Sequence, residues 1–125
     1  MTIKLPVLKQ SFDNGELLCV EHEASFDIDT SVYSEERWEK NFPDLAAKEG
    51  LFQYIERVQE NAVTDRVRVS CMLKAIYCFI ESPEVPTYKQ FAQMISLSTP
   101  EYTVRMLERL KSAFDIILNG SSVKN

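Results

Sequence analysis

Few residues in this 125-residue chain are of the types that carry out chemistry. His22 is the only histidine, and it lies in an alternating segment among acidic residues, a pattern typical of a surface position. A zinc site would need further histidines or cysteines at ligand spacing. A serine–histidine–aspartate set would need its single histidine in a well-defined place. The sequence therefore predicts neither a metal centre nor a nucleophilic triad.

The cysteines at 19, 71 and 78 are an odd number and are widely spaced, unlike a disulfide framework. Cys71 and Cys78 are seven residues apart. On one helix they would be separated by about 10 Å along the axis, which is too far for a disulfide. We expect all three thiols to behave as small apolar side chains.

Carboxylates are frequent between residues 21 and 36, but they lack the order and the central glycine of a calcium-binding EF-hand loop. Only three glycines occur, at 15, 50 and 120, so the chain has no glycine-rich phosphate loop. These carboxylates are best interpreted as a solvated acidic face. With no convergent polar set, we expect no cofactor, no metal and no enzymatic activity.

The bulk composition narrows the possible partners. A net charge of −5 repels phosphate backbones, which argues against nucleic-acid binding. No run of about 18 apolar residues is present, and the first residues lack the apolar stretch of a signal peptide. The expected location is therefore a cytoplasm, with no membrane partner. An apolar fraction of 45% is enough for one core in one domain.

The N-terminal third carries the pattern of a β-hairpin. Val20, His22, Ala24, Phe26 and Ile28 fall on one parity, which predicts a strand over 17–28 with one covered face. The turn signal at 13–15 would join it to a strand over 3–8 that is interrupted at Pro6. Because an isolated hairpin is marginal in water, it must pack on helices, pair with another chain or stay loose.

Capping residues and apolar spacing predict helices in the rest of the chain. Ser34 is expected to cap a short helix ending near Asn41, and Asp44 to cap a segment at 45–49. Leu51, Ile55, Val58 and Ala62 predict the next helix. The helix from Thr64 or Asp65 to Ile80 is apolar nearly all round and should be central. Thr87 with Gln90 forms a capping box, and Pro100 suits the start of a last helix that ends near Leu118.

Together these signals predict a mainly α fold, a compact bundle of about five helices with a short N-terminal hairpin or extended segment. We assign residues 1–30 to the hairpin arm, 31–120 to the helical domain and 121–125 to a flexible polar tail.

The segment from Thr87 to Lys111 admits a different interpretation, as a DNA-binding helix-turn-helix. Its second helix would present Glu101, Tyr102 and Thr103, with Arg105 as the first basic residue. That is a poor set for a recognition helix in an acidic domain. A DNA-binding regulator is thus an alternative, and another helical adaptor protein is a third.

Three strings carry a resemblance to a known family: FDIDTS at 26–31, EERWEKNFP at 35–43 and LFQYIERV at 51–58. Over this stretch, which is under a third of the chain, the sequence resembles the tail assembly chaperones of long-tailed phages and prophages of Gram-positive bacteria.

The resemblance implies a non-enzymatic chaperone that binds the tape measure protein, keeps its apolar segments soluble during tail assembly and is absent from the mature virion. It also implies action in the cytoplasm of a bacterial host, possible homo-oligomers of ring or spiral form, and, in many relatives, a frameshifted C-terminal extension. A groove between helices can receive an apolar helix face. Candidate contact residues are surplus aromatic and aliphatic side chains, each of which could equally belong to the core: Trp38, Phe42, Phe52, Val104, Ile116 and Leu118.

Overall fold

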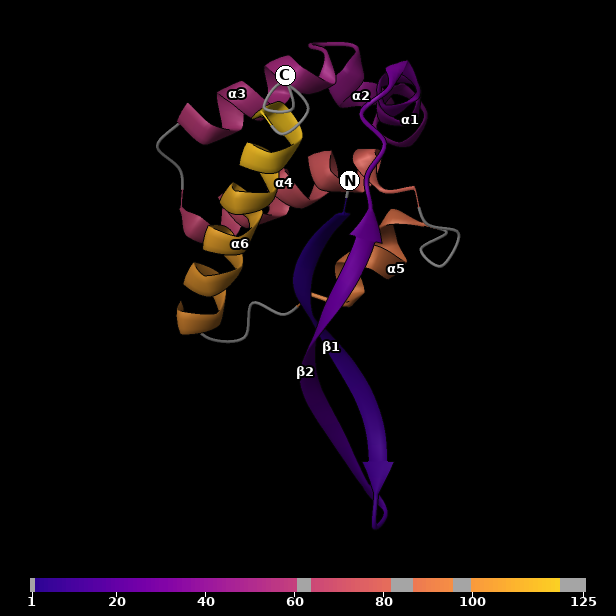
Figure 1. Ribbon diagram of the computed structural model, residues 1–125, viewed down its shortest axis with the longest axis vertical. Helices are drawn as coiled ribbons and strands as arrows, with labels where there is room; N and C mark the ends of the chain where they lie inside the picture. Colours follow the sequence, from indigo (N-terminus) through magenta and orange to yellow (C-terminus); the bar gives the residue numbers. More distant parts are fainter. Residues whose placement is uncertain (1, 61–63, 82–86, 96–99, 120–125) are drawn as a thin grey trace.

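The computed structural model describes residues 2–60, 64–81, 87–95 and 100–119, with only the backbone described at 8–13, 17–21, 60 and 100. Within these residues the chain forms an N-terminal antiparallel hairpin followed by six helices (Figure 1). The predicted mainly α fold with an N-terminal hairpin is confirmed. The predicted tail at 121–125 and the predicted cap at Gly120 lie outside the described residues.

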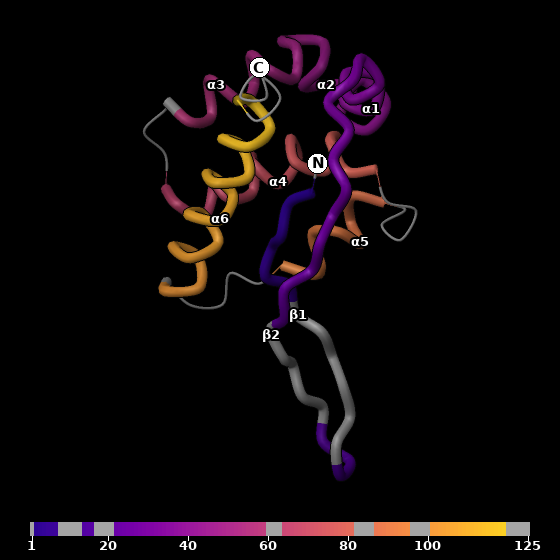
Figure 2. The backbone as a smooth tube through the Cα atoms, viewed as in Figure 1, coloured from indigo at the N-terminus to yellow at the C-terminus, as the bar shows by residue number. Residues whose placement is uncertain are grey.

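Strands β1 (Thr2–Asp13) and β2 (Glu16–Asp27) pair from Thr2↔Asp27 to Asp13↔Glu16. Asn14 and Gly15 form the turn, and both have positive φ, 52° and 80°. This is the signature of a two-residue type I′ turn, whose twist matches that of the strands. The predicted turn is therefore confirmed, and the tube in Figure 2 shows it well away from the helices.

The predicted interruption at Pro6 is wrong, because Pro6 pairs with Glu23 inside a continuous β1. In a two-residue hairpin the pair that flanks the turn is hydrogen-bonded, and hydrogen-bonded and non-hydrogen-bonded pairs then alternate along the ladder. Counting from Asp13↔Glu16 makes Pro6↔Glu23 a non-hydrogen-bonded pair. The proline nitrogen therefore faces away from β2, and its missing N–H breaks no ladder bond.

The base of the hairpin is part of the hydrophobic core. Ile3, Leu5 and Val7 of β1 are buried, as is Phe26 of β2, and all four belong to the same apolar cluster as the helices. On the predicted covered face of β2 the burial fades toward the turn: Phe26 is buried, Ala24 is half-buried and His22 is exposed. The helices thus cover only the base of the arm.

Helix α1 (Val32–Asn41) is capped by Ser31, whose Oγ accepts a hydrogen bond from the Tyr33 backbone N–H. The predicted cap, Ser34, is instead buried inside the helix, and its hydroxyl donates to the Ser31 carbonyl at 2.8 Å. The helix ends where the Phe42 N–H bonds the Trp38 carbonyl. Pro43 then opens the single turn α2 (Pro43–Ala46), so Asp44 lies in its first turn and does not cap it.

Helix α4 (Asp65–Phe79) is the central element, as predicted from its apolar residues. It starts at the predicted cap Thr64, whose hydroxyl accepts from the Val67 N–H. It contacts α1, α3 (Leu51–Glu60), α5 (Tyr88–Gln93) and α6 (Pro100–Asn119). Figure 1 shows α3 and α1 above it and α6 crossing it.

Helices α5 and α6 complete the core. Thr87 caps α5 as predicted, accepting from the Gln90 N–H at 3.1 Å. Helix α6 packs against both α4 and β1. Its predicted apolar stripe is buried at Met106, Leu110, Ala113, Phe114 and Ile117.

Candidate functional site

The six predicted contact residues divide by exposure. Trp38 is completely buried, its Nε1 donates to the Glu49 carbonyl at 3.0 Å, and its ring lies 4.7 Å from that of Tyr54. A partner cannot reach it in this conformation, so Trp38 is corrected from a contact residue to a core residue. Phe42 and Leu118 are half-buried against the core. Phe52, Val104 and Ile116 are exposed by 38%, 46% and 42%.

The structure does not bring these three exposed residues together. Phe52 is on α3, where its ring packs on that of Phe79 at 5.7 Å between centroids. Val104 and Ile116 are both on α6 but twelve residues apart, so they lie about 18 Å apart along the axis. Val104 and Ile116 are therefore not neighbours on the surface of α6.

Ile116 does line a groove, which we call the β1–α6 groove. Its walls come from the start of β1 and from the second half of α6, and its volume is about 320 Å³. This is at the lower end of the range for ligand pockets. The lining residues are Thr2, Ile3, Lys4, Arg109, Ser112, Ala113 and Ile116.

Arg109 fixes the geometry of this groove. Its guanidinium donates to both carboxylate oxygens of Glu23, at 2.5 and 2.6 Å, and to the Lys4 carbonyl at 2.9 Å. The hydrogen bond from Arg109 lowers the pKa of Glu23 below its usual range. A bidentate pair of this kind is more directional than a lysine contact. Arg109 thus connects α6 to both strands of the hairpin. The groove remains apolar at Ile116.

A second open depression, of about 450 Å³, lies along the first half of α6 and is lined by Glu101, Val104, Arg105 and Glu108. It contains Glu101 and Arg105 of the surface that a helix-turn-helix would turn toward DNA, whereas Thr103, also predicted for that surface, is buried. It carries two carboxylates for one guanidinium, so it does not favour a phosphate backbone. The turn proposed at 97–99 lies outside the described residues.

Three exposed apolar residues escaped the sequence analysis: Val32 and Tyr33 on α1, and Val67 near the start of α4, which is exposed by 48%. Val32 and Tyr33, in the first turn of α1, are exposed by 80% and 55%. The buried residues Ser34 and Trp38 define the inner side of this helix. The spacing of Val32 from Trp38 would have shown that it points elsewhere, had the helix start been placed at Ser31 rather than at Ser34.

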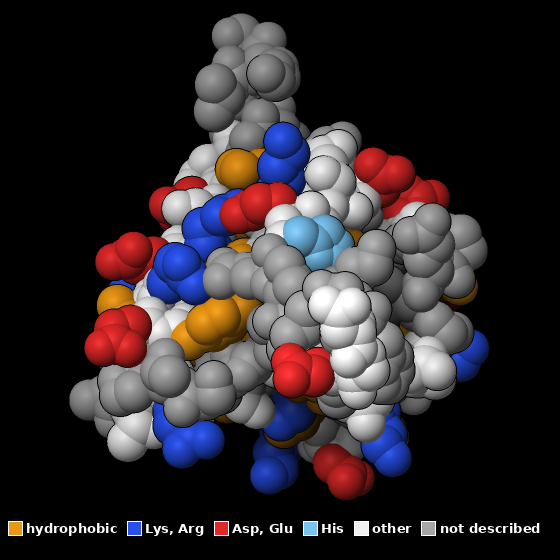
Figure 3. All heavy atoms as spheres, turned by 90° about the horizontal axis from the view of Figure 1, so that it is seen from below, with side chains coloured by type: hydrophobic (Ala, Val, Ile, Leu, Met, Phe, Trp, Pro, Cys, Tyr) orange, Lys and Arg blue, Asp and Glu red, His pale blue; other side chains and the backbone are white. Residues whose placement is uncertain are grey.

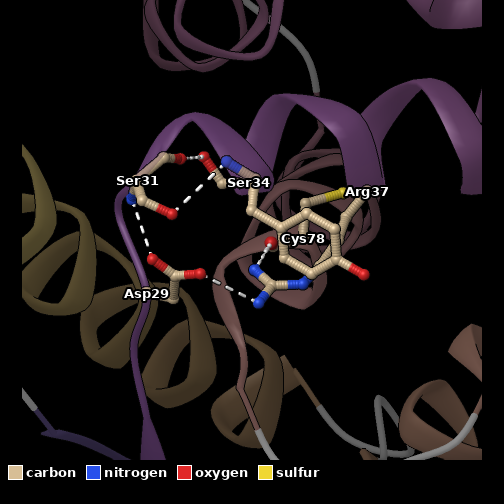
Figure 4. Close-up of polar contacts among 6 residues, drawn as sticks. Asp29, Ser31, Ser34, Arg37 and Cys78 are labelled. Atoms are coloured by element: carbon tan, nitrogen blue, oxygen red, sulfur yellow. Dashed lines mark hydrogen bonds and ion pairs between the residues drawn. The ribbon is translucent and has the colours of Figure 1, made fainter.

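The residues that carry the family resemblance hold the hairpin, α1 and α4 together (Figure 4). Arg37 donates to the Asp29 carboxylate at 3.1 Å and to the Cys78 carbonyl at 2.8 Å, and its guanidinium lies 4.6 Å from the centre of the Tyr33 ring. The Asp29 carboxylate also accepts from the Ser31 N–H at 2.9 Å. The contacts that these motif residues make between elements therefore explain why they are an arginine, an aspartate and a serine.

The remaining reactive side chains do not converge. Cys78 is buried, and burial raises the pKa of its thiol to about 12, so it stays protonated at neutral pH. His22 is exposed. Across the described parts of the chain, no three histidine, cysteine or acidic residues gather as a metal site would require.

The surface seen along the hairpin is mixed in character (Figure 3). Basic and acidic side chains alternate there, and apolar side chains show only in small areas between them. None of the helices in the described residues is long and apolar enough to cross a lipid bilayer. The face seen in Figure 3 therefore offers an apolar partner only small contact areas.

Comparison with known proteins found no matching family model, no similar curated protein and no similar solved structure.

Proposed function

We propose that this chain is a tail assembly chaperone that binds apolar segments of a phage tape measure protein without catalysis. The proposal rests on the resemblance over 26–58 and on one observation in the structure, the β1–α6 groove with the exposed Ile116 at its edge. An aliphatic side chain of a partner helix can lie beside Ile116 and remove both surfaces from water. The net charge of −5 would keep the loaded complex soluble.

Co-expression with a helical fragment of the tape measure protein tests the function. The expected result is that the fragment moves from the insoluble to the soluble fraction and co-purifies with this chain. If its solubility is unchanged and the two proteins do not co-purify, the proposal is wrong. A chaperone should also be absent from purified virions, whereas its presence there would favour a structural adaptor.

A single substitution tests the groove. We expect Ile116→Asp to weaken capture of the fragment about tenfold, because the carboxylate would lose its hydration beside an apolar partner. Ile116 is exposed, so the melting temperature should change little. Lys111→Asp, at an exposed position of α6 outside the groove, is the matched control. Equal capture by both variants would remove the groove from the binding surface.

A further inference from the structure

The backbone groups of the hairpin alternate in direction. Counting from the hydrogen-bonded pair Asp13↔Glu16, the even-numbered residues of β1 and the odd-numbered residues of β2 turn their N–H and C=O groups outward. Two contacts agree with this count. The Lys4 carbonyl reaches Arg109 on one outer edge, and the Asp27 carbonyl accepts from the Glu81 N–H on the other.

Both outer edges are closed at the base of the hairpin. On β1, Arg109 occupies the Lys4 carbonyl, and Pro6 removes the next outward donor. On β2, Ile28 forms a bridge with Ile80, in which the Asp29 N–H donates to the Phe79 carbonyl at 2.8 Å. Beyond these points Figure 1 shows no helix beside the arm. The strand edges are thus protected where the body lies and open farther out.

The two open edges are not equivalent. Strand β2 runs from Glu16 to Asp27 without a proline and contains the aliphatic run 17–20, whereas β1 contains Pro6. Exposed, proline-free edges rich in apolar residues pair readily with another strand. At its base, β2 already accepts an antiparallel neighbour at Ile80. The outer edge of β2 is therefore the better template.

We infer that two copies of this chain associate through the outer edges of their β2 strands, paired antiparallel about Cys19, to form a four-stranded sheet. Only registers that match outward-facing residues are allowed. The register centred on Cys19 places the exposed Glu16 opposite the exposed His22 of the second copy, twice by symmetry. Shifting the centre by one residue places Glu16 opposite Val20 or Ala24 instead. The polar match selects Cys19 as the centre, because an imidazole N–H can donate a hydrogen bond to the Glu16 carboxylate.

This pairing would also stabilise the outer part of the hairpin. A two-stranded ribbon is marginal in water, while a sheet of more strands is stable. Each hydrogen-bonded residue pair in the new ladder satisfies two donors and two acceptors that otherwise face solvent. The contact is isologous, so it closes at two copies and leaves the β1–α6 groove outside the new ladder.

Proline substitutions test which edge is used. We expect sedimentation of the full chain from low micromolar to millimolar concentration to show a monomer–dimer equilibrium. Cys19→Pro removes an outward donor from β2 and should leave only monomer. Gln10→Pro, at the position paired with Cys19 across the ladder, removes an outward donor from β1 and should leave dimerisation unchanged. Circular dichroism should show the same helix content in both variants.

Charge exchange tests the register. His22→Glu faces Glu16 with a like charge and should weaken the dimer about tenfold over its two symmetric contacts. Adding Glu16→Lys to His22→Glu should restore the dimer, because each pair then carries opposite charges. Mild oxidation should also yield a Cys19–Cys19 disulfide in peptide mapping, since hydrogen-bonded partners have Cα atoms about 5.5 Å apart.

Two results would overturn the inference. The first is a monomer at every concentration, and the second is a dimer that Cys19→Pro leaves intact. A dimer that Gln10→Pro also abolishes would overturn the assignment to the β2 edge. Failure of the charge pair to rescue would overturn the register. None of these measurements uses a tape measure protein, so the inference and the proposed function can fail separately.

Discussion

Arg37 and Asp29 join three elements through two side chains. The guanidinium connects the last carbonyls of α4 with the residue that follows β2, and the carboxylate also orders the start of α1 through Ser31. The exposed fractions of the two side chains are 15% and 19%, so water screens the pair only in part. Hydrogen bonding to Ser31 is the largest cause that lowers the pKa of Asp29, and the charge of Arg37 adds to it.

We predict that Asp29→Asn lowers the free energy of unfolding by about 1–2 kcal/mol at pH 7, because a hydrogen bond to a charged group contributes roughly 1.5–3 kcal/mol and water screens part of this pair. In a domain of this size the melting temperature should fall by about 3–6 °C for each kcal/mol. Thermal unfolding followed by circular dichroism measures it. Asp115→Asn, at an exposed position of α6, is the control and should have the same melting temperature as the natural protein. Equal melting of both variants would show that the network carries no net stability.

The same carboxylate predicts a pH dependence. Its pKa is lower in the folded state than in the unfolded state, so the unfolded chain binds the proton more readily. Its stabilising contribution is complete above about pH 5, roughly one unit above the ordinary pKa of aspartate, and is lost as the pH falls through the folded value. The melting difference between the natural protein and Asp29→Asn should therefore shrink between about pH 5 and pH 3. A difference that stays constant over this interval would contradict the assignment.

At the residue scale, the sequence predicted the chemical character of side chains better than the contacts that they make. The cysteines were expected to be inert, and Cys78 is buried as a small apolar residue would be. Trp38 was placed in a partner surface because aromatic residues are common there, yet its indole N–H bonds a carbonyl 11 residues away. The Arg37 contact spans 41 residues. Local spacing carries no information about partners so distant in the chain.

At the scale of elements, α3 is capped by a side chain from another helix. Both carboxylate oxygens of Glu35 on α1 accept from the Leu51 N–H, at 3.1 and 3.2 Å. A negative charge at the N-terminus of a helix also interacts favourably with the helix dipole. No capping residue within α3 itself could have revealed this contact, because the cap comes from 16 residues earlier.

We predict that Glu35→Ala costs about 1 kcal/mol of stability, the usual effect of losing a helix cap. Because the Leu51 N–H loses its acceptor in this variant, amide exchange at the start of α3 should be faster than in the natural protein. Glu39→Ala, on the exposed side of the same helix, should leave that exchange unchanged and serves as the control. Exchange at Leu51 that is equally slow in both variants would rule out the cap.

The ends of elements were the least predictable features. Ser34 fits a cap by type and by the acidic residues after it, but its side chain is buried and the helix begins three residues earlier. Thr87 was predicted correctly because no competing capping residue lies beside it, and between Thr64 and Asp65, which both remained candidates, the structure selects Thr64. Propensity therefore located caps where one candidate stood alone and failed where several followed one another.

At the scale of the whole molecule, the hairpin base and the helices share one core. Leu5 is fully buried within the cluster that also contains the stripe of α6. The proposed division into an arm at 1–30 and a helical domain at 31–120 describes the outline of the chain, but the core crosses that boundary. The β1–α6 groove could not be foreseen for the same reason: its two walls are about one hundred residues apart in the sequence.

We predict that Leu5→Ala destabilises the protein by about 2–5 kcal/mol, as for other large-to-small changes in a core. Ser25→Ala, at an exposed position of the paired strand, should change stability by less than about 0.5 kcal/mol. Chemical denaturation measures both. A small effect of Leu5→Ala would mean that the arm is a separate unit, and a chain starting at residue 31 would then fold alone.

The packing of β1 on α6 also sets an order of events during synthesis. Strand β1 leaves the ribosome before α6 is synthesised, so the apolar side chains of Ile3, Leu5 and Val7 lack their α6 neighbours until that helix has been made. Nascent chains that stop before α6 would expose these side chains to proteases and to molecular chaperones. The packing of α6 on β1 is thus a late step in reaching the native state.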